Sequence, residues 1–296
     1  MRRLIVLTTL GALLALLLPV GVAFGQQPPP GPTVRYQTKF EVPNPPAEFE
    51  VVQMVLDFAP GAWTPPHTHG GTLFTTVMEG ETTVRGKSGE QKYGPGQTFV
   101  EIPGEVNEVG NSAAAKSRVL TSALLPTGAA LTTIQQSGSQ QPPPGATTVY
   151  QYKSEVVKPT GPFEVIHQVL DFAPGAFTPL HYHGGQDFVT VVAGEQIVRQ
   201  DGAERRLKAG ETWTEAIGQH TVAGNPGPEN LNVVATFLLP KGAQLTTPVQ
   251  GDAAAPAMLP KTGEADPRAA PAWLLLVGGS ALLAAGWLAR RRPRQA

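Results

Sequence analysis

Two pairs of histidines have a spacing that could support chemistry. His67 and His69 form one His-x-His pair, and His181 and His183 form a second. Alternate residues of a β-strand point to the same face, so each pair would present two imidazoles side by side. Imidazoles suit iron, manganese, nickel, copper and zinc. If these segments are strands, the spacing predicts a divalent transition-metal site.

The two pairs lie in two copies of one repeat. Residues 28–134 and 142–248 align without a gap, and roughly half of the aligned residues are identical. Both copies contain Val-Leu-Asp-Phe-Ala-Pro-Gly-Ala, at residues 55–62 and 169–176. Such self-similarity indicates a duplication, and it predicts two similar units in tandem.

Each copy is a series of short apolar or alternating runs separated by Gly, Pro, Asn and Asp, which is typical of a sandwich or barrel. No long amphipathic helix is apparent between the two ends of the chain. The sequence therefore predicts an all-β fold, for which a jelly roll is suitable. In the second copy the expected strands are residues 163–172, 188–192, 195–199, 211–214 and 231–239.

The surroundings of the histidines resemble the first motif of the cupin superfamily, in which a Gly precedes His-x-His and a Glu and a second Gly follow. The second copy supplies Gly175, His181, His183, Asp187 and Gly194 in this order. The first copy supplies Gly61, His67, His69, Leu73 and Gly80. The resemblance implies two tandem cupin barrels, also called double-stranded β-helices or jelly rolls, and hence a bicupin.

The resemblance also implies a metal-ligand set, which the copies match unequally. In the second copy His181, His183, Asp187 and His220 would be the ligands, with Asp187 in place of the family's Glu. In the first copy Leu73 replaces the carboxylate and Asn107 replaces the last His, which leaves a weakened second site of His67 and His69. We therefore expect about one metal ion per chain, in the second copy.

The activity implied by the resemblance is broad. Cupins include dioxygenases, decarboxylases and isomerases, so a metal-dependent oxidoreductase or lyase acting on a small organic molecule is one hypothesis. A non-enzymatic module that binds a small-molecule ligand, or serves as a structural domain, is the alternative. No catalytic residue is assigned. Glu101 and Glu215 match between the copies, and we interpret them as structural residues at strand edges.

The N-terminus predicts secretion. Two arginines precede an apolar run over residues 4–18, and small residues follow before Gly25. This pattern is typical of a cleaved signal peptide with a signal helix, although an uncleaved membrane anchor is the alternative.

The C-terminus predicts surface anchoring. Leu259, Pro260, Thr262 and Gly263 belong to an L-P-x-T-G sequence, which precedes an apolar stretch and an arginine-rich tail. This arrangement resembles a sortase sorting signal, which implies transfer to the cell wall. The apolar stretch is long enough for a transmembrane helix, so a plain plasma-membrane anchor with the barrels outside is the alternative.

Composition limits the other functions. The chain has no cysteine, which excludes disulfides and thiolate chemistry. Its formal net charge is −1, and no cluster of Lys and Arg lies between the two ends, so a nucleic-acid partner is not expected. Assembly into a homo-oligomer is left open. The predicted divisions are 1–25 signal peptide, 26–134 cupin domain 1, 135–146 Pro/Gln-rich linker, 147–248 cupin domain 2, 249–271 linker with the sorting motif, 272–289 transmembrane segment and 290–296 basic cytoplasmic tail.

Overall fold

The computed structural model describes residues 30–135 and 145–249, and every regular element in these ranges is a β-strand. Within them, no helix is long and apolar enough to cross a membrane. The predicted signal helix, the sorting motif and the C-terminal apolar stretch lie outside the described residues. The all-β prediction is confirmed for the described part of the chain.

Barrel one is built mainly from the first copy. Its five-stranded sheet has the order β11-β2-β9-β4-β7, and a three-stranded sheet, β6-β5-β8, and a two-stranded sheet, β10-β3, complete it. The strands are β2 (Phe49–Phe58), β3 (His67–Thr68), β4 (Thr72–Glu79), β5 (Thr82–Gly86), β6 (Gly89–Tyr93), β7 (Thr98–Glu101), β8 (Glu108–Gly110), β9 (Ser117–Pro126), β10 (Thr133–Ile134) and β11 (Thr147–Val157).

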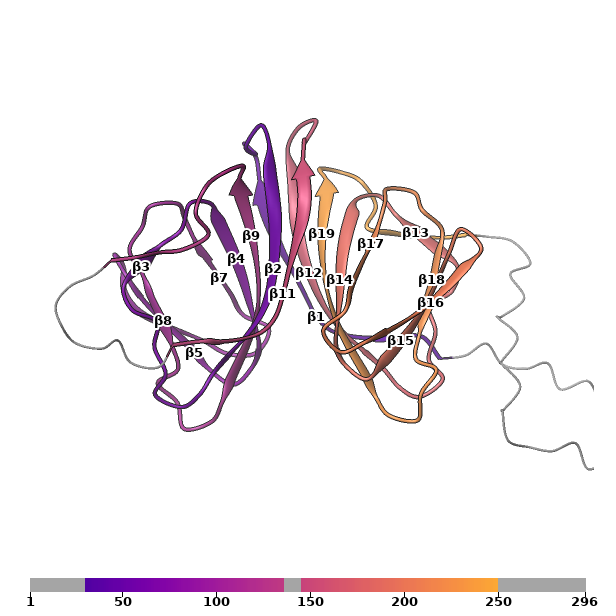
Figure 1. Ribbon diagram of the computed structural model, residues 1–296, viewed down its shortest axis with the longest axis horizontal. Coiled ribbons are helices and arrows are strands. Elements are labelled where there is room, and N and C mark those ends of the chain that lie inside the picture. The colour runs from indigo at the N-terminus through magenta and orange to yellow at the C-terminus, as the bar shows by residue number, and fades with distance from the viewer. Residues whose placement is uncertain (1–29, 136–144, 250–296) are drawn as a thin grey trace, which may run out of the picture. The chain divides into compact units, whose positions relative to one another are not determined.

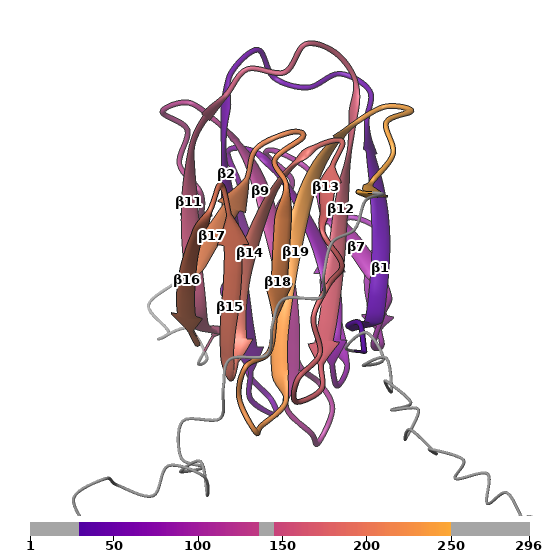
Figure 2. The ribbon, with the colours of Figure 1, turned by 90° about the vertical axis from the view of Figure 1, so that its right-hand side faces the viewer.

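Barrel two is built mainly from the second copy. Its sheets have the orders β1-β12-β19-β14-β17 and β16-β15-β18-β13-β20, and the second of these faces the viewer in Figure 2. The strands are β1 (Thr33–Val42), β12 (Phe163–Phe172), β13 (His181–His183), β14 (Gln186–Ala193), β15 (Glu195–Gln200), β16 (Ala203–Lys208), β17 (Thr212–Glu215), β18 (Thr221–Gly224), β19 (Leu231–Pro240) and β20 (Thr246–Pro248).

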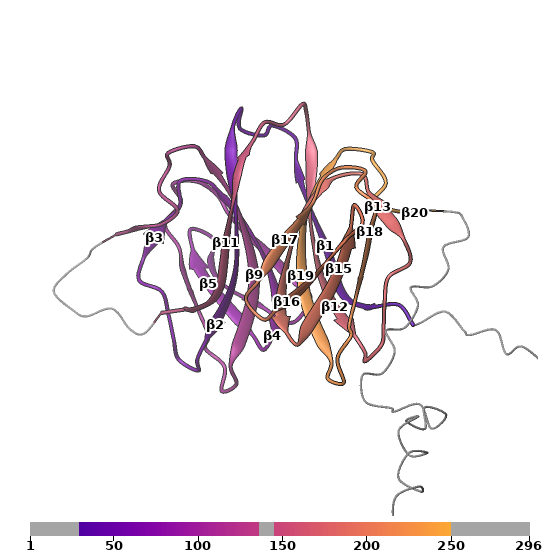
Figure 3. The same cartoon turned by 45° about the vertical axis from the view of Figure 1, so that its right-hand side comes forward.

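The first strand of each copy belongs to the sheet of the other copy. Strand β1 begins the first copy but pairs with β12, and β11 begins the second copy but pairs with β2 (Figure 1, Figure 3). Matching ion pairs occur at both junctions, where Lys39 bonds Glu164 and Lys153 bonds Glu50. The repeat boundaries in the sequence therefore do not coincide with the boundaries of the sheets.

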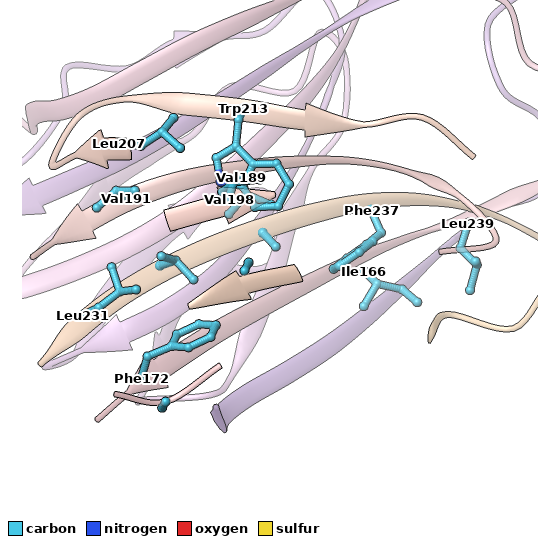
Figure 4. Close-up of a cluster of buried hydrophobic side chains, with 14 residues drawn as sticks. Ile166, Phe172, Val189, Val191, Val198, Leu207, Trp213, Leu231, Phe237 and Leu239 are labelled. Atoms are coloured by element: carbon cyan, nitrogen blue, oxygen red, sulfur yellow. The ribbon is translucent and has the colours of Figure 1, made fainter. Parts of the chain in front are cut away.

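Alternation along the strands gives each large sheet two buried faces. In barrel two one face packs against the second sheet, as in Figure 4, where Trp213 of β17 and Phe237 of β19 lie among aliphatic side chains. The other face meets barrel one through matched pairs of residues from the two copies, such as Phe49 with Phe163 and Phe74 with Phe188. The contact between the barrels is therefore reciprocal.

Polar side chains at the centre of this contact are also matched. Ser122 and Thr236, which occupy equivalent positions, are hydrogen-bonded at 2.7 Å. His167 is 1% exposed, and its ring nitrogens lie 3.0 Å from the hydroxyls of Thr76 and Ser122. His167 is thus a packing residue, which agrees with its lack of any sequence motif.

Candidate metal centres

His181 and His183 lie on the short strand β13, whereas His67 lies on β3 and His69 directly follows it; all four imidazoles are buried inside the barrels. The exposed fractions of His67, His69, His181 and His183 are between 4% and 8%. The ring centroids are 4.7 Å apart in barrel one and 4.8 Å apart in barrel two. The intervening residues, Thr68 and Tyr182, are less buried, as expected when alternate side chains point to opposite faces.

Backbone carbonyls orient all four rings in the same way. The Nδ1 atoms of His67 and His69 lie 2.9 Å and 2.7 Å from the carbonyl oxygens of Pro65 and Leu131. In barrel two the corresponding acceptors are Pro179 and Leu245, both at 2.8 Å. A carbonyl oxygen can only accept, so each Nδ1 carries the proton. Each neutral imidazole therefore presents the lone pair of Nε2 to the barrel interior, as a metal ligand requires.

A buried glutamate faces each histidine pair. In barrel one the Nε2 atoms of His67 and His69 lie 3.6 Å and 3.5 Å from Glu101 Oε2. In barrel two His183 Nε2 lies 3.8 Å from Glu215 Oε1. The two glutamates end β7 and β17, which are edge strands of their sheets as expected, but they are only 4% and 2% exposed and face the histidines.

A pattern in the sequence predicts that these two glutamates are buried. Each follows a large aromatic residue by two positions, as Phe99–Glu101 and Trp213–Glu215, and alternation puts both members of such a pair on one strand face. Both aromatics are core residues. A glutamate on the same face as a core aromatic, conserved between the two copies, indicates a buried carboxylate.

The predicted ligand set of the second copy is only partly assembled. His181, His183 and Glu215 place their ligand atoms within 4.8 Å of one another. Asp187 is 1% exposed and pairs across the strands with Glu215, but its Oδ2 is 4.0 Å from His183 Nε2. Asp187 Oδ1 instead accepts the backbone N–H of Glu215 at 2.8 Å, so Asp187 lies beside the cluster.

His220 is not brought to the cluster. It is exposed, and its ring stacks on Tyr182 with 5.7 Å between the ring centroids. Tyr182 is the outward-facing residue between the two buried histidines, so His220 lies on the other side of the same strand.

The first copy assembles the same kind of cluster as the second. His67, His69 and Glu101 also place their ligand atoms within 4.8 Å of one another. Leu73 stands opposite Glu101 across β4 and β7, where Asp187 stands opposite Glu215 in barrel two. Asn107 pairs with His67 through backbone hydrogen bonds and supplies no third imidazole. The two barrels therefore differ by one carboxylate, not by a lost site.

The additional carboxylate of barrel two, Asp187, makes the electrostatics of the two sites different. In barrel one, burial opposes ionisation of Glu101, but the facing imidazoles of His67 and His69 lower its pKa from 4.5 to about 2. Burial also lowers the pKa of His67, but hydrogen bonding to Glu101 and to Pro65 raises it above its ordinary value on balance. Without a metal ion, barrel one thus holds an ionised carboxylate and favours a proton on His67.

In barrel two burial dominates. It lowers the pKa of His181, and it lowers the pKa of His183 to about 4. Burial raises the pKa of Glu215 to about 7, and burial together with the nearby Glu215 raises the pKa of Asp187 well above its ordinary value. Barrel two thus favours neutral groups until a cation compensates its carboxylates.

The donor atoms fit a divalent transition metal. The Nε2 atoms of His67 and His69 are 3.1 Å apart. Metal–nitrogen bonds of about 2.1 Å place two such nitrogens about 3.0–3.4 Å apart. One carboxylate oxygen in each barrel, Glu101 Oε2 or Glu215 Oε2, is buried without a hydrogen-bond partner. Two imidazoles with a carboxylate are a common donor set for such ions.

The clusters open onto interior cavities of different size. The cavity of barrel one has a volume of about 390 Å³ and includes His67, His69 and Glu101 in its lining. The cavity of barrel two has a volume of about 230 Å³ and includes His181, His183, Asp187 and Glu215. Each barrel therefore combines possible metal ligands with space for a small molecule.

Comparison with known proteins supports the fold. Residues 168–237 match the Cupin domain family. The vicilins of Solanum melongena and Solanum lycopersicum have similar structures, with 12% identity and TM-scores of 0.54 and 0.53. Each match covers 68% of this chain and 78% of the vicilin. The oxalate decarboxylase of Bacillus subtilis matches with 13% identity and a TM-score of 0.48, over 75% of this chain and 76% of the enzyme. No curated protein sequence matches this chain. Identities this low show the fold and not the activity.

Proposed function

We propose that this chain, a two-barrel protein of the cupin superfamily, holds a divalent transition-metal ion in each barrel and uses the adjoining cavity to bind or transform a small organic molecule. The ligands are His67, His69 and Glu101 in barrel one, and His181, His183 and Glu215 in barrel two. The proposal replaces the expectation of a single strong site in the second copy.

One observation carries the proposal. In each barrel two buried imidazoles have their Nδ1 atoms occupied by backbone carbonyls, so both Nε2 lone pairs point toward a buried glutamate. Such a group of acceptors is costly to bury unless a proton or a cation lies among them. When bound, the metal would supply Lewis acidity or a site for an oxygen-bearing substrate.

The residues of the chain would orient and shield that chemistry. The carbonyls of Pro65, Leu131, Pro179 and Leu245 fix the ring orientation, and they keep each Nδ1 protonated. Thr132 and Thr246 place hydroxyls 3.3 Å and 3.2 Å from the Nδ1 atoms of His69 and His183. The largely apolar lining of the cavities would strengthen electrostatic interactions inside.

A non-enzymatic role is the second candidate, and one comparison favours it. The vicilin of Solanum melongena holds different anionic ligands in structurally similar pockets. By analogy, this chain could hold a small ligand without turnover. An assay for oxygen consumption and carbon dioxide release over dicarboxylates and flavonols separates the two roles, because a binding module would retain metal and show no turnover.

Metal content tests the proposal directly. Protein reconstituted with iron, manganese, nickel, copper or zinc should retain about two ions per chain, one for each donor set. The double variants His67→Ala/His69→Ala and His181→Ala/His183→Ala should each lose one ion, whereas the exposed His220→Ala should lose none. Elemental analysis gives the count. No retained ion from any of the five metals would refute the metal proposal.

The cellular location is part of the proposal and rests on the two ends of the chain. We propose that the barrels are secreted and held at the cell surface, by a sortase through Leu259–Gly263 or by the apolar stretch in the plasma membrane. Mass spectrometry of wall-released protein should find a C-terminus at Thr262 if a sortase acts. A detergent-extractable protein that retains Trp273 and Trp287 would support the membrane anchor instead.

A further inference from the structure

The two cavities differ because equivalent positions carry side chains of different size. Phe237 of barrel two packs edge-on against the ring of His183, with the centroids 4.9 Å apart, and it is 2% exposed. The equivalent residue of barrel one is Ala123, and Phe99 stands in place of Trp213. In barrel two, aromatic rings therefore occupy the space beside the histidines. The equivalent space in barrel one is open.

The cavities also differ in polarity. Thr75 and Thr121 line the cavity of barrel one, and their hydroxyls are hydrogen-bonded to each other at 3.0 Å. Val189 and Ala235 occupy the equivalent positions in barrel two. Two hydroxyls that share one hydrogen bond have a second hydrogen left to donate. In barrel one that hydrogen is available to a ligand inside the cavity.

The charge available to a ligand is different as well. Three ligands with one carboxylate leave a bound divalent ion in barrel one with one uncompensated positive charge. In barrel two Asp187 adds a second buried carboxylate within 4.0 Å of His183, so the same ion is neutralised by protein. An anionic oxygen donor is therefore attracted to the ion of barrel one and not to that of barrel two.

The wall of the larger cavity offers apolar side chains beside exposed polar ones, Thr132, Thr148 and Gln151. Its lining includes Pro65, Leu131 and Ile134, and the Ile134 side chain is 49% exposed. Pro248 stands in place of Ile134 in barrel two. A ligand of barrel one can thus place an apolar body against these residues while its anionic group reaches the interior.

From these differences, and resting on the metal proposal above, we infer that barrel one is the ligand-binding barrel and takes a small organic anion with an apolar body. The anionic oxygen lies at the ion held by His67, His69 and Glu101, within reach of Thr75 and Thr121. Barrel two holds its ion without an external ligand and serves as a closed structural centre.

Cobalt(II) is a suitable probe, because its visible spectrum responds to a change of ligands. Full-length protein is loaded with cobalt, its metal content is measured first, and it is then titrated with acetate, hexanoate or the neutral hexanamide. The His181→Ala/His183→Ala variant, which keeps barrel one, should respond to hexanoate as the wild type does. The His67→Ala/His69→Ala variant should not respond. Hexanoate should bind at least about 10-fold more tightly than acetate, since additional methylene groups are buried.

Two further variants give barrel one the side chains of barrel two. Ala123→Phe should retain cobalt but weaken hexanoate at least about 10-fold by filling the cavity. Thr75→Val should retain cobalt and weaken all carboxylates without changing the preference for hexanoate over acetate. Phe237→Ala in barrel two is the matched control and should leave the titration unchanged. If Ala123→Phe does not fold, Thr75→Val and the two histidine variants still decide.

Several results would overturn the inference while leaving the metal proposal intact. These are an equal response from the protein that keeps only barrel two, equal binding of hexanamide and hexanoate, or unchanged hexanoate affinity in both Ala123→Phe and Thr75→Val. Absence of cobalt in the initial metal measurement, together with no retained iron, manganese, nickel, copper or zinc, would instead refute the metal proposal itself, and the inference with it.

Discussion

Asp187 and Glu215 face one another across β14 and β17, and the two carboxyls are the most strongly perturbed acids of barrel two. In the metal-free protein their raised pKa values mean that the folded state keeps protons that the unfolded chain has released above about pH 4.5. Stability therefore falls as the pH rises from about 4.5 toward the raised pKa of about 7 of Glu215. A bound cation removes this cost, because it stabilises the ionised carboxylates.

We predict that Asp187→Asn reduces this loss of stability. Asparagine keeps an oxygen that can accept the backbone N–H of Glu215, but it does not titrate. As the pH rises from about 4.5 to about 7, between the ordinary pKa of Glu215 and its raised value, thermal unfolding in the presence of a chelator should show a smaller loss of Tm in the variant than in the wild type. His183 favours folding as the pH rises over part of this interval, but it does so in both proteins, so the difference between their slopes reports the carboxyls. An unchanged slope would contradict the assignment of the protons to this pair.

The strands that carry the ligands depend on close backbone approaches. Gly71 and Gly185 follow the His-x-His pairs, and a Cβ on either would collide with the carbonyl oxygen of Leu124 or Leu238. Glycine at these positions lets the start of β4 and β14 lie directly against β9 and β19. The glycines after the histidines therefore position the site although they offer no ligand.

We predict that Gly185→Ala destabilises the protein by about 2–3 kcal/mol and lowers metal retention in barrel two, because the backbone must move away from Leu238. Gly175→Ala is the control for backbone strain: its φ is positive, at 75°, whereas that of Gly185 is not, and the added methyl group meets no atom within 4 Å. The control should cost about 1 kcal/mol. Denaturant unfolding measures both values, and a cost at Gly185 no larger than that at Gly175 would contradict the close approach to Leu238 as the cause.

Periodicity in the sequence predicted the central strands well. The expected strand 163–172 coincides with β12, and the expected strands at 188–192, 195–199, 211–214 and 231–239 lie within or overlap β14, β15, β17 and β19. These strands are buried on at least one face, so their apolar residues repeat clearly. The short strands β13, β18 and β20 have too few residues for a period to show.

The pairing of strands that are far apart in the sequence could not be predicted from periodicity. The strand that follows residue 146 could pair with either copy, because both copies present nearly the same partner sequence, as at 55–62 and 169–176. Likewise, alignment with the expected cupin motif selected Asp187 and His220 as ligands, whereas the register of β14 with β17 selects Glu215. The alternation of residue types along a strand predicts which face of the sheet each side chain occupies. The cross-strand neighbours of a residue depend on the tertiary pairing of the strands.

At the scale of the whole molecule, the buried polar contact between the barrels includes a titratable group. Burial lowers the pKa of His167 to about 3, so the folded protein holds a neutral imidazole where the unfolded chain would bind a proton below pH 6.5. The stability that this difference supplies is complete above pH 6.5 and is lost as the pH falls toward 3.

We predict that His167→Gln shifts acid unfolding to lower pH. The first copy already carries Gln53 at the equivalent position, where its Nε2 donates to Thr190 at 2.7 Å, so glutamine fits this environment. At pH 7 the variant should lie within about 1 kcal/mol of the wild type. Circular dichroism during acid titration measures the midpoint, with the exposed His220→Gln as a control that should not move it. A midpoint unchanged by His167→Gln would exclude protonation of this residue as a cause of acid unfolding.

Strand exchange leads to a prediction about cleavage. If a protease site is placed within residues 136–144 and cut, β1 should remain paired with β12 and β11 with β2. The two fragments should therefore elute together from a sizing column under native conditions and separate in denaturant. Separation without denaturant would show that the exchanged strands and the apolar contact do not hold the halves together.

The same exchange restricts how the two copies can diverge after a duplication. Each copy supplies a strand to the other barrel, so deleting one copy would remove β1 from β12 or β11 from β2. A copy can therefore change its interior side chains, as Leu73 differs from Asp187 and Ala123 from Phe237, but it cannot be discarded. The architecture allows one half of the gene to specialise while selection on the other half preserves its backbone.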